Sequence, residues 1–253
     1  SIHGTLAARG DTNAPVCHDC HGVHNTRGHK DPKATTFAMN VPNLCGQCHR
    51  EGQQAAVRYK GSNHNPVESY VESIHGKGLI QSGLVVTAMC ADCHTAHREL
   101  PASDERSTVN PNNIAATCAK CHNGIYEKFR ASIHSPLLYK GDKPLPHCPD
   151  CHTSHQITRA DSEGFKLAVL NQCGRCHEEV TKSYFETFHG KVSKLGFAAT
   201  AKCHDCHGAH DILPPNDPAS HLSRDNIIET CGKCHPGSHR QFAGYLTHAT
   251  HHE

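Results

Sequence analysis

The sequence predicts a protein of short α-helices and loops, with little regular structure, built as four similar repeats around a core that apolar side chains do not supply. Three observations predict this fold. The chain is poor in apolar residues, it is rich in histidine and cysteine, and one pattern recurs four times along its 253 residues.

The composition leaves too little apolar material for an ordinary core. Apolar residues make up 36% of the chain even with 16 cysteines included, and tryptophan is absent, whereas a globular domain has roughly 45–50%, counted with glycine. Histidine occurs 26 times, more often than Lys and Arg together at 25. The net charge of +1 and the scattered basic residues indicate no nucleic-acid surface. The surplus histidines are therefore candidate ligands.

A Cys-x-x-Cys-His motif occurs eight times and accounts for every cysteine. The motifs form four doublets, whose first cysteines are 28, 28, 25 and 28 residues apart. We call the members of a doublet its first and second motif. Each first motif continues to a trailing histidine, as in Cys17 to His24, and a leading histidine stands 14 or 15 residues before the doublet. The predicted repeats are residues 1–70, 71–130, 131–186 and 187–253.

Within the repeats, the spacing of apolar residues predicts helices over Asn113–Ile133, Leu167–Phe188 and Asn226–Leu246. Signals for β-strands are weak. The first repeat is longest, and its polar insertion at Gln53–Val67 is expected to form a surface loop.

The motif is typical of covalent haem attachment. Two thiols about one helical turn apart form thioethers with the haem vinyl groups, and the adjacent imidazole reaches the iron. Zinc sites also use Cys-x-x-Cys, but they do not require the histidine that follows all eight motifs here. A disulfide framework is a still less favoured alternative. The sequence predicts eight haem c groups, attached through Cys17, Cys20, Cys45, Cys48, Cys90, Cys93, Cys118, Cys121, Cys148, Cys151, Cys173, Cys176, Cys203, Cys206, Cys231 and Cys234.

Histidine is the expected ligand on both sides of each iron. The proximal ligands are His21, His49, His94, His122, His152, His177, His207 and His235. Only Met39 and Met89 could supply thioether ligands, so histidine is expected on the distal side as well. The distal candidates are His3, His24, His75, His97, His134, His155, His189, His210 and His248.

Geometry restricts which iron a trailing histidine can serve. His21 and His24 are three residues apart and face the same way on a helical turn, so they cannot bind opposite faces of one haem. We expect His24, His97, His155 and His210 to bind the second-motif haem of their own doublets, on His49, His122, His177 and His235. Such interleaving predicts a continuous haem stack.

The distal candidates number nine for eight irons, and His248 follows a segment similar to those before His134 and His189. We treat the leading histidines and His248 as one series. If each binds a haem of the following doublet, His248 has no haem in its own chain, and if each binds a haem of the preceding doublet, His3 has none. The sequence therefore predicts that the protein self-associates end to end, as an open polymer unless the rotation closes a ring.

Residues Ser73-Ile74-His75-Gly76, followed by Cys90 to His97 and by Cys118 to His122, resemble the doubled Cys-x-x-Cys-His multihaem cytochromes of metal- and sulfur-respiring prokaryotes. The resemblance covers the whole chain, as an octahaem member. It implies bis-histidine haems, electron transfer in anaerobic or extracellular respiration, and a kinship with class III-like carriers and the subunits of extracellular cytochrome filaments.

The expected function is electron transfer to and from redox partner proteins, with no catalytic residues. The alternative is a multihaem reductase acting on nitrite, hydroxylamine or a sulfur oxyanion at one open haem, which a high-spin iron would reveal. No segment is apolar for the roughly 20 residues that a membrane span needs. Haem attachment to this motif occurs outside the cytoplasm, so we expect an extracellular or periplasmic protein whose signal peptide has been removed.

Overall fold

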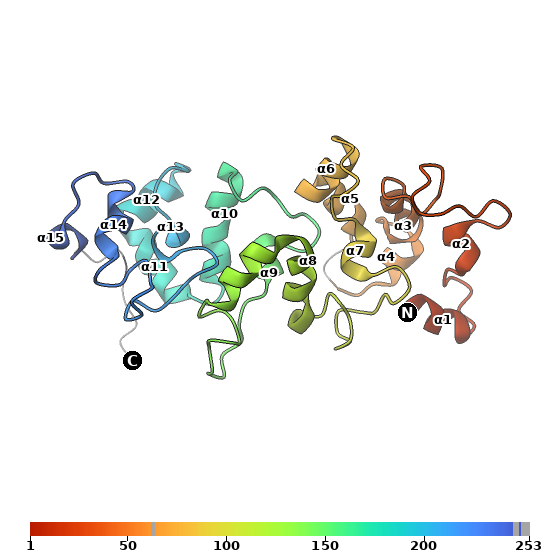
Figure 1. The fold of residues 1–253 in the computed structure, drawn as a ribbon, viewed down its shortest axis with the longest axis horizontal. Coiled ribbons are helices and arrows are strands. Elements are labelled where there is room, and N and C mark those ends of the chain that lie inside the picture. Colours follow the sequence, from red (N-terminus) through yellow and green to blue (C-terminus); the bar gives the residue numbers. More distant parts are fainter. Residues whose placement is uncertain (62–63, 245–247, 249–253) are drawn as a thin grey trace. The chain divides into compact units, whose positions relative to one another are not determined.

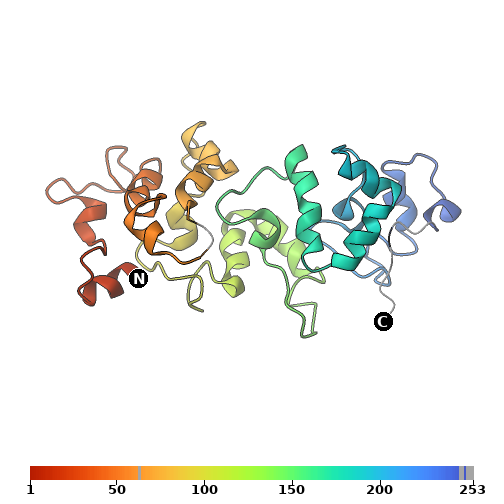
Figure 2. The same cartoon turned by 180° about the vertical axis from the view of Figure 1, so that it is seen from behind.

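The computed structural model describes residues 1–61, 64–244 and 248, and within these residues it contains fifteen α-helices and no β-strand (Figures 1 and 2). The prediction of short helices joined by loops is confirmed. The chain forms two compact units, one of Ser1–Cys118 with His152–Thr158 and the other of Ala119–Cys151 with Arg159–Glu253. No helix in the described part of the chain is long and apolar enough to span a bilayer.

Most helices of the first unit are shorter than three turns. They are α1 (Ile2–Ala8), α2 (Cys17–His21), α3 (Val41–His49), α4 (Gln54–Arg58), α5 (Pro66–Glu72), α6 (Ile74–Ile80), α7 (Cys90–His94) and the first part of α8 (Pro111–Arg130). The insertion predicted as a loop at Gln53–Val67 contains α4, which buries Ala56.

The second unit begins within α8 and continues with similarly short helices. They are α9 (Cys148–His152, whose last residue belongs to the first unit), α10 (Glu163–Gly174), α11 (Glu178–Glu186), α12 (Phe188–Lys194), α13 (Cys203–His207), α14 (Ile227–Gly232) and α15 (Arg240–Ala243).

Every first motif forms a five-residue helix that begins at its first cysteine and ends at its histidine: α2, α7, α9 and α13. An aspartate before the second cysteine accepts a hydrogen bond from the backbone N–H that precedes the helix. In α2, Asp19 Oδ2 lies 2.7 Å from the Val16 nitrogen, and in α7, Asp92 Oδ2 lies 2.8 Å from the Met89 nitrogen. This bond satisfies a donor that a short helix leaves unpaired, and it fixes where the motif begins.

The second motifs divide the longer helices that the sequence predicts. His122 has φ −103° and ψ 42°, and His177 has φ −108° and ψ 49°, so neither continues an α-helix. The predicted helix at Leu167–Phe188 is therefore divided into α10 and α11. The predicted helix at Asn226–Leu246 becomes α14 and α15. Its residues Tyr245 and Leu246 lie outside the described residues.

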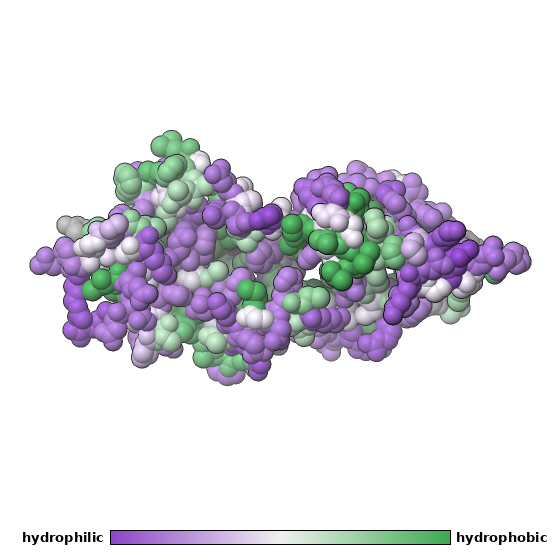
Figure 3. All heavy atoms as spheres, turned by 45° about the horizontal axis from the view of Figure 1, so that its top comes forward, coloured by the Kyte–Doolittle hydropathy of each residue, from purple (hydrophilic) through white to green (hydrophobic). Residues whose placement is uncertain are grey.

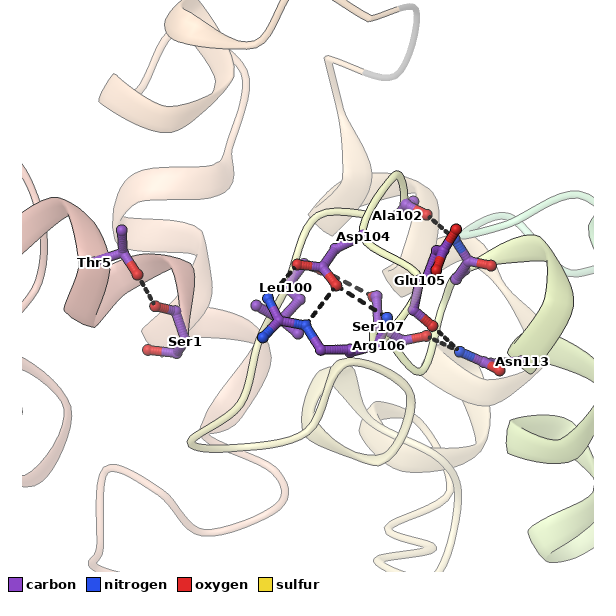
Figure 4. Close-up of polar contacts among 10 residues, drawn as sticks. Ser1, Thr5, Leu100, Ala102, Asp104, Glu105, Arg106, Ser107 and Asn113 are labelled. Carbon is purple, nitrogen blue, oxygen red and sulfur yellow. Dashed lines mark hydrogen bonds and ion pairs between the residues drawn. The ribbon is translucent and has the colours of Figure 1, made fainter.

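Asparagine side chains hold the loop before the second motif in three repeats. Asn113 Nδ2 donates to the carbonyl oxygens of Glu105 and Ser107, at 2.7 and 2.8 Å (Figure 4). Asn40 and Asn226, at the same position in their repeats, donate to two carbonyls each. Because the amide pairs two loop carbonyls that no helix satisfies, it orders a loop that has few apolar contacts.

The apolar core is small. The large side chains less than a tenth exposed are few, among them Val67, Tyr70, Leu79, Leu170 and Tyr184. The accessible surface is 16502 Å² for 27.6 kDa. A globular protein of this mass exposes about 11,000 Å², and two separate globular units of half the mass would expose about 13,000 Å². The polypeptide therefore buries much less of itself than its size allows.

Candidate functional site

Histidine rings meet in opposed pairs, each joining a motif histidine to a distal candidate. The first unit holds three pairs. Their ring centres are 6.1 Å apart for His3 and His49, 5.9 Å for His21 and His97, and 6.0 Å for His94 and His155.

The second unit repeats this geometry. The ring centres are 6.1 Å apart for His134 and His177, 6.0 Å for His189 and His235, and 5.8 Å for His207 and His248. All six pairs therefore share one separation within 0.3 Å, the difference between 5.8 and 6.1 Å.

This separation is that of two imidazoles on opposite sides of one metal ion. The ion holds each nitrogen at about 2 Å, and each nitrogen lies about 1.1 Å from its ring centre, so the ring centres stand about 6.2 Å apart. Aromatic rings in direct offset or edge contact lie about 4.5–7 Å apart, so it is the near-identity of the six separations, and not their size alone, that matches a common ion. The described residues contain no group of three or more His, Cys, Asp or Glu side chains placed to hold a metal ion. What each pair brings together is two imidazole rings.

The structure corrects the predicted assignment of the trailing histidines. His97 and His155 lie opposite first-motif histidines of the preceding repeat, and leading histidines lie opposite the second-motif residues His49, His177 and His235. His97 and His155 therefore lie opposite histidines other than those of the second motifs in their own doublets. The cause is local: the residue after each first-motif histidine has a positive φ, which turns the chain away. These residues are Gly22, Thr95, Thr153 and Gly208.

The unmatched ligand also differs from the prediction. His3 and His248 are both paired, whereas His24 is exposed and its ring contacts no other histidine among the described residues. Four candidate ligands are not in these six pairs but do take part in other interactions: His75, His122, His152 and His210.

The two motif types give different relative orientations of the paired rings. The rings paired with first-motif histidines are nearly parallel, at 19°, 6° and 25°. Those paired with second-motif histidines are tilted, at 53°, 39° and 50°.

The cysteines of successive motifs are neighbours, and none of the sixteen forms a disulfide. A hydrogen bond with Cys90 raises the pKa of Cys45, and one with Cys203 raises the pKa of Cys173. Each bond joins the second motif of one repeat to the first motif of the next.

Thiols are also close within a doublet. Burial, and then the neighbouring Cys173, raises the pKa of Cys151 to about 11. Burial and Cys231 do the same for Cys206. The motifs of each unit therefore follow one another in space in the order of the sequence.

Burial also favours neutral imidazole at several paired histidines. It lowers the pKa of His155 to about 4, with a further contribution from His94, and it lowers the pKa of His94 and His207. Neutral imidazole is the form that binds a metal ion.

Two kinds of supporting residue were not expected from the sequence. One is the aspartate of each first motif, and the other is the tyrosine before a leading histidine. Tyr70 donates to the Ala88 carbonyl at 3.0 Å, and Tyr184 donates to the Ala201 carbonyl at 2.7 Å, each next to a first motif. Aligning the four repeats would have revealed the aspartates, because the third residue of all four first motifs is aspartate.

Neither a family model nor a curated protein sequence matches the chain.

Proposed function

We propose that this protein is a c-type cytochrome that binds eight haems covalently, holds each iron between two histidines, and transfers electrons along the haem series. The observation that carries the proposal is the common separation of the six histidine pairs, 5.8–6.1 Å between ring centres. A porphyrin would supply the four ligands that the protein pairs lack.

The cysteines fit covalent attachment. In each motif the two thiols lie one turn apart in sequence, next to the histidine that binds the iron. Each S–H adds across a vinyl C=C, which forms one C–S bond and one C–H bond with nothing released. The polypeptide leaves 16502 Å² of its surface accessible, and haem groups would pack against the apolar and polar parts of that surface.

The repeat pattern assigns the remaining ligands. Six irons take the paired histidines, and His75, His122, His152 and His210 supply the ligands of the other two. All eight irons are then filled, and His24 is left over.

The order of the thiols supports transfer from haem to haem. When bound, haem supplies an iron that gains and loses one electron. Because each thioether joins the polypeptide to the haem edge, the Cys45–Cys90 and Cys173–Cys203 contacts draw the edges of successive haems together. Histidine on both sides of the iron favours low potentials relative to His-Met ligation.

Denaturing mass spectrometry tests the attachment. We expect the polypeptide plus eight haem masses, and seven in a Cys17→Ser, Cys20→Ser variant. His18→Ala is a matched control, since His18 lies inside the same motif with its side chain 61% exposed, and it should keep eight. A chain without haem, or one carrying zinc instead, would refute the proposal.

Electron paramagnetic resonance of the oxidised protein tests the ligands. We expect only low-spin iron and no change on adding cyanide. A high-spin haem that binds cyanide or nitrite would instead indicate an open iron, and with it a reductase.

A further inference from the structure

The residue before the second cysteine of a motif has a charge that depends on the type of motif. In the first motifs this residue is always an aspartate. In the second motifs it is never acidic, and in three of the four it is a cation. In chain order the eight residues are Asp19, Gln47, Asp92, Lys120, Asp150, Arg175, Asp205 and Lys233. We call them the motif charges, with Gln47 as the neutral member.

The structure holds each of the four aspartates against its own motif. The carboxylate oxygen Oδ2 accepts a hydrogen bond from the backbone N–H that precedes the motif helix. The distances are 2.7 Å for Asp19, 2.8 Å for Asp92, 2.6 Å for Asp150 and 2.8 Å for Asp205. The negative charge therefore stays beside the short helix that carries both cysteines and the proximal histidine.

The hydrogen bond alone does not explain why a charge is present. A neutral asparagine side chain could accept the same bond through its amide oxygen. A carboxylate at all four first motifs adds a charge that the bond does not need, and the cations of the second motifs have the opposite sign. The pattern therefore points to an electrostatic role that differs between the two haems of a doublet.

A charge beside a haem shifts the potential at which the iron is reduced. A negative charge stabilises the oxidised iron, and a positive charge stabilises the reduced iron. The motif charges are exposed, and Figure 3 shows hydrophilic residues over much of the surface, so water screens their effect. We expect each charge to change the ratio of reduced to oxidised haem roughly two- to fivefold, which is about 20–40 mV for one electron.

We propose that the motif charges make the second-motif haems easier to reduce than the first-motif haems, so that the four electrons of the half-reduced protein lie on the second-motif irons. Each electron from an external one-electron donor converts one ferric iron to ferrous iron. Transfer along the series oxidises that iron again as it reduces its neighbour. Because the motifs of each unit follow one another in sequence order, this occupancy separates reduced irons by an oxidised one and lowers the repulsion between added electrons.

Lys202 adds a buried charge at one first motif. It directly precedes Cys203, it is 1% exposed, and its ammonium donates to two loop carbonyls. The other repeats have Val16, Met89 and His147 at this position. Buried charges are screened much less than exposed ones. Lys202 should therefore raise the potential of the His207 haem above those of the other first-motif haems.

This inference rests on the proposed function, and a redox titration separates the two. The haem-loaded protein is reduced stepwise at controlled potential and followed by the absorbance of reduced haem. The titration is run at pH 8, well above the usual pKa of histidine. One variant carries Asp19→Asn, Asp92→Asn, Asp150→Asn and Asp205→Asn. It keeps an acceptor for the hydrogen bond, and it should raise the low-potential half of the curve by about 20–40 mV while the high-potential half stays in place.

The opposite variant removes the cations. Lys120→Gln, Arg175→Gln and Lys233→Gln together copy Gln47 of the first repeat, and they should lower only the high-potential half. A matched control removes one loop aspartate from each repeat, through Asp31→Asn, Asp104→Asn, Asp161→Asn and Asp217→Asn. It removes the same total charge outside the motifs, so the two halves should keep their separation. Lys202→Met, which copies Met89, should lower the potential of a single haem.

Electron paramagnetic resonance shows which haems are reduced first, because ferric low-spin iron gives a signal and ferrous low-spin iron gives none. The signals that His177→Met alters belong to the tilted second-motif pairs, and those that His94→Met alters belong to the nearly parallel first-motif pairs. At half reduction the second-motif signals should be lost and the first-motif signals should remain.

Loss of the first-motif signals first, or of both kinds together, would overturn the inference. So would a low-potential half that the four motif asparagines do not raise, or loop variants that change the separation as much as the motif variants do. Fewer than eight haems in the wild type, or a haem that binds cyanide, would instead refute the proposed function.

Discussion

Gly76 and Gly190 occupy the position after a leading histidine, where the chain passes close to a tyrosine carbonyl. A Cβ added at Gly76 would lie 2.0 Å from the Tyr70 oxygen, and one at Gly190 would lie 2.1 Å from the Tyr184 oxygen. The obstacle is backbone, so it cannot rotate away. The glycine therefore lets the leading histidine begin its helix directly against the preceding one.

We expect Gly76→Ala and Gly190→Ala each to destabilise the haem-loaded protein by about 2–3 kcal/mol, the cost of forcing atoms into a filled site. Gly4→Ala is the matched control at the same position of the first repeat, where a Cβ would meet only Ser1 Oγ at 3.5 Å. It should change stability by less than about 1 kcal/mol. The shift of the denaturation midpoint measures both, and equal effects at the three glycines would contradict the explanation.

At the scale of the helical elements, the angle between two paired imidazole rings depends on whether the motif histidine belongs to the first or the second motif of its doublet. First-motif pairs differ by at most 25° and second-motif pairs by at least 39°. Nearly parallel imidazole planes split the iron d orbitals more strongly than tilted planes do, which reduces the anisotropy of the low-spin signal.

Electron paramagnetic resonance should therefore show two groups of low-spin signals rather than one. His94→Met, in a nearly parallel pair, should remove intensity from the less anisotropic group. His177→Met, in a tilted pair, should remove it from the more anisotropic group. A single class of signal, or loss from the wrong group, would show that ring orientation does not follow motif order.

The sequence predicts the motifs and candidate ligands better than it predicts which histidines face each other. The spacing of cysteines and histidines gives the motifs and the candidate ligands, because each motif is local. Which histidines face each other depends on the turn after the first motif. All four residues at this turn have a positive φ. Glycine at positions 22 and 208 is typical of that conformation, whereas threonine at positions 95 and 153 does not indicate it. The helix breaks at His122 and His177 were missed for a similar reason, since the apolar spacing continues across them.

At the scale of the whole molecule, the composition correctly predicts how little the chain can bury. Its largest fully buried side chains include Lys202 and five serines along with Leu79. The Lys202 ammonium donates to the Ala198 carbonyl at 2.6 Å and to the Thr200 carbonyl. Burial lowers the pKa of this lysine. Polar groups thus occupy positions that apolar side chains fill in ordinary domains.

We expect the proposed haems to add much of the apolar burial that stabilises the fold. Burying apolar surface contributes roughly 25 cal/mol per Å², while ordering the backbone costs about 1–2 kcal/mol per residue. A polypeptide that leaves 16502 Å² exposed buries about 60% of the roughly 40,000 Å² of its unfolded chain, the marginal fraction typical of a very small domain. The fold is expected to exist only with its haems attached.

The chain produced without haem attachment should therefore be unfolded. With a reducing agent present to prevent disulfides, we expect a circular dichroism spectrum dominated by disorder and no cooperative thermal transition. The haem-loaded protein at the same concentration, as the control, should show the helices of the structure and a clear transition. A haem-free chain that keeps these helices and melts cooperatively would mean that side-chain packing alone specifies the fold, and that the paired histidines are arranged before any haem binds.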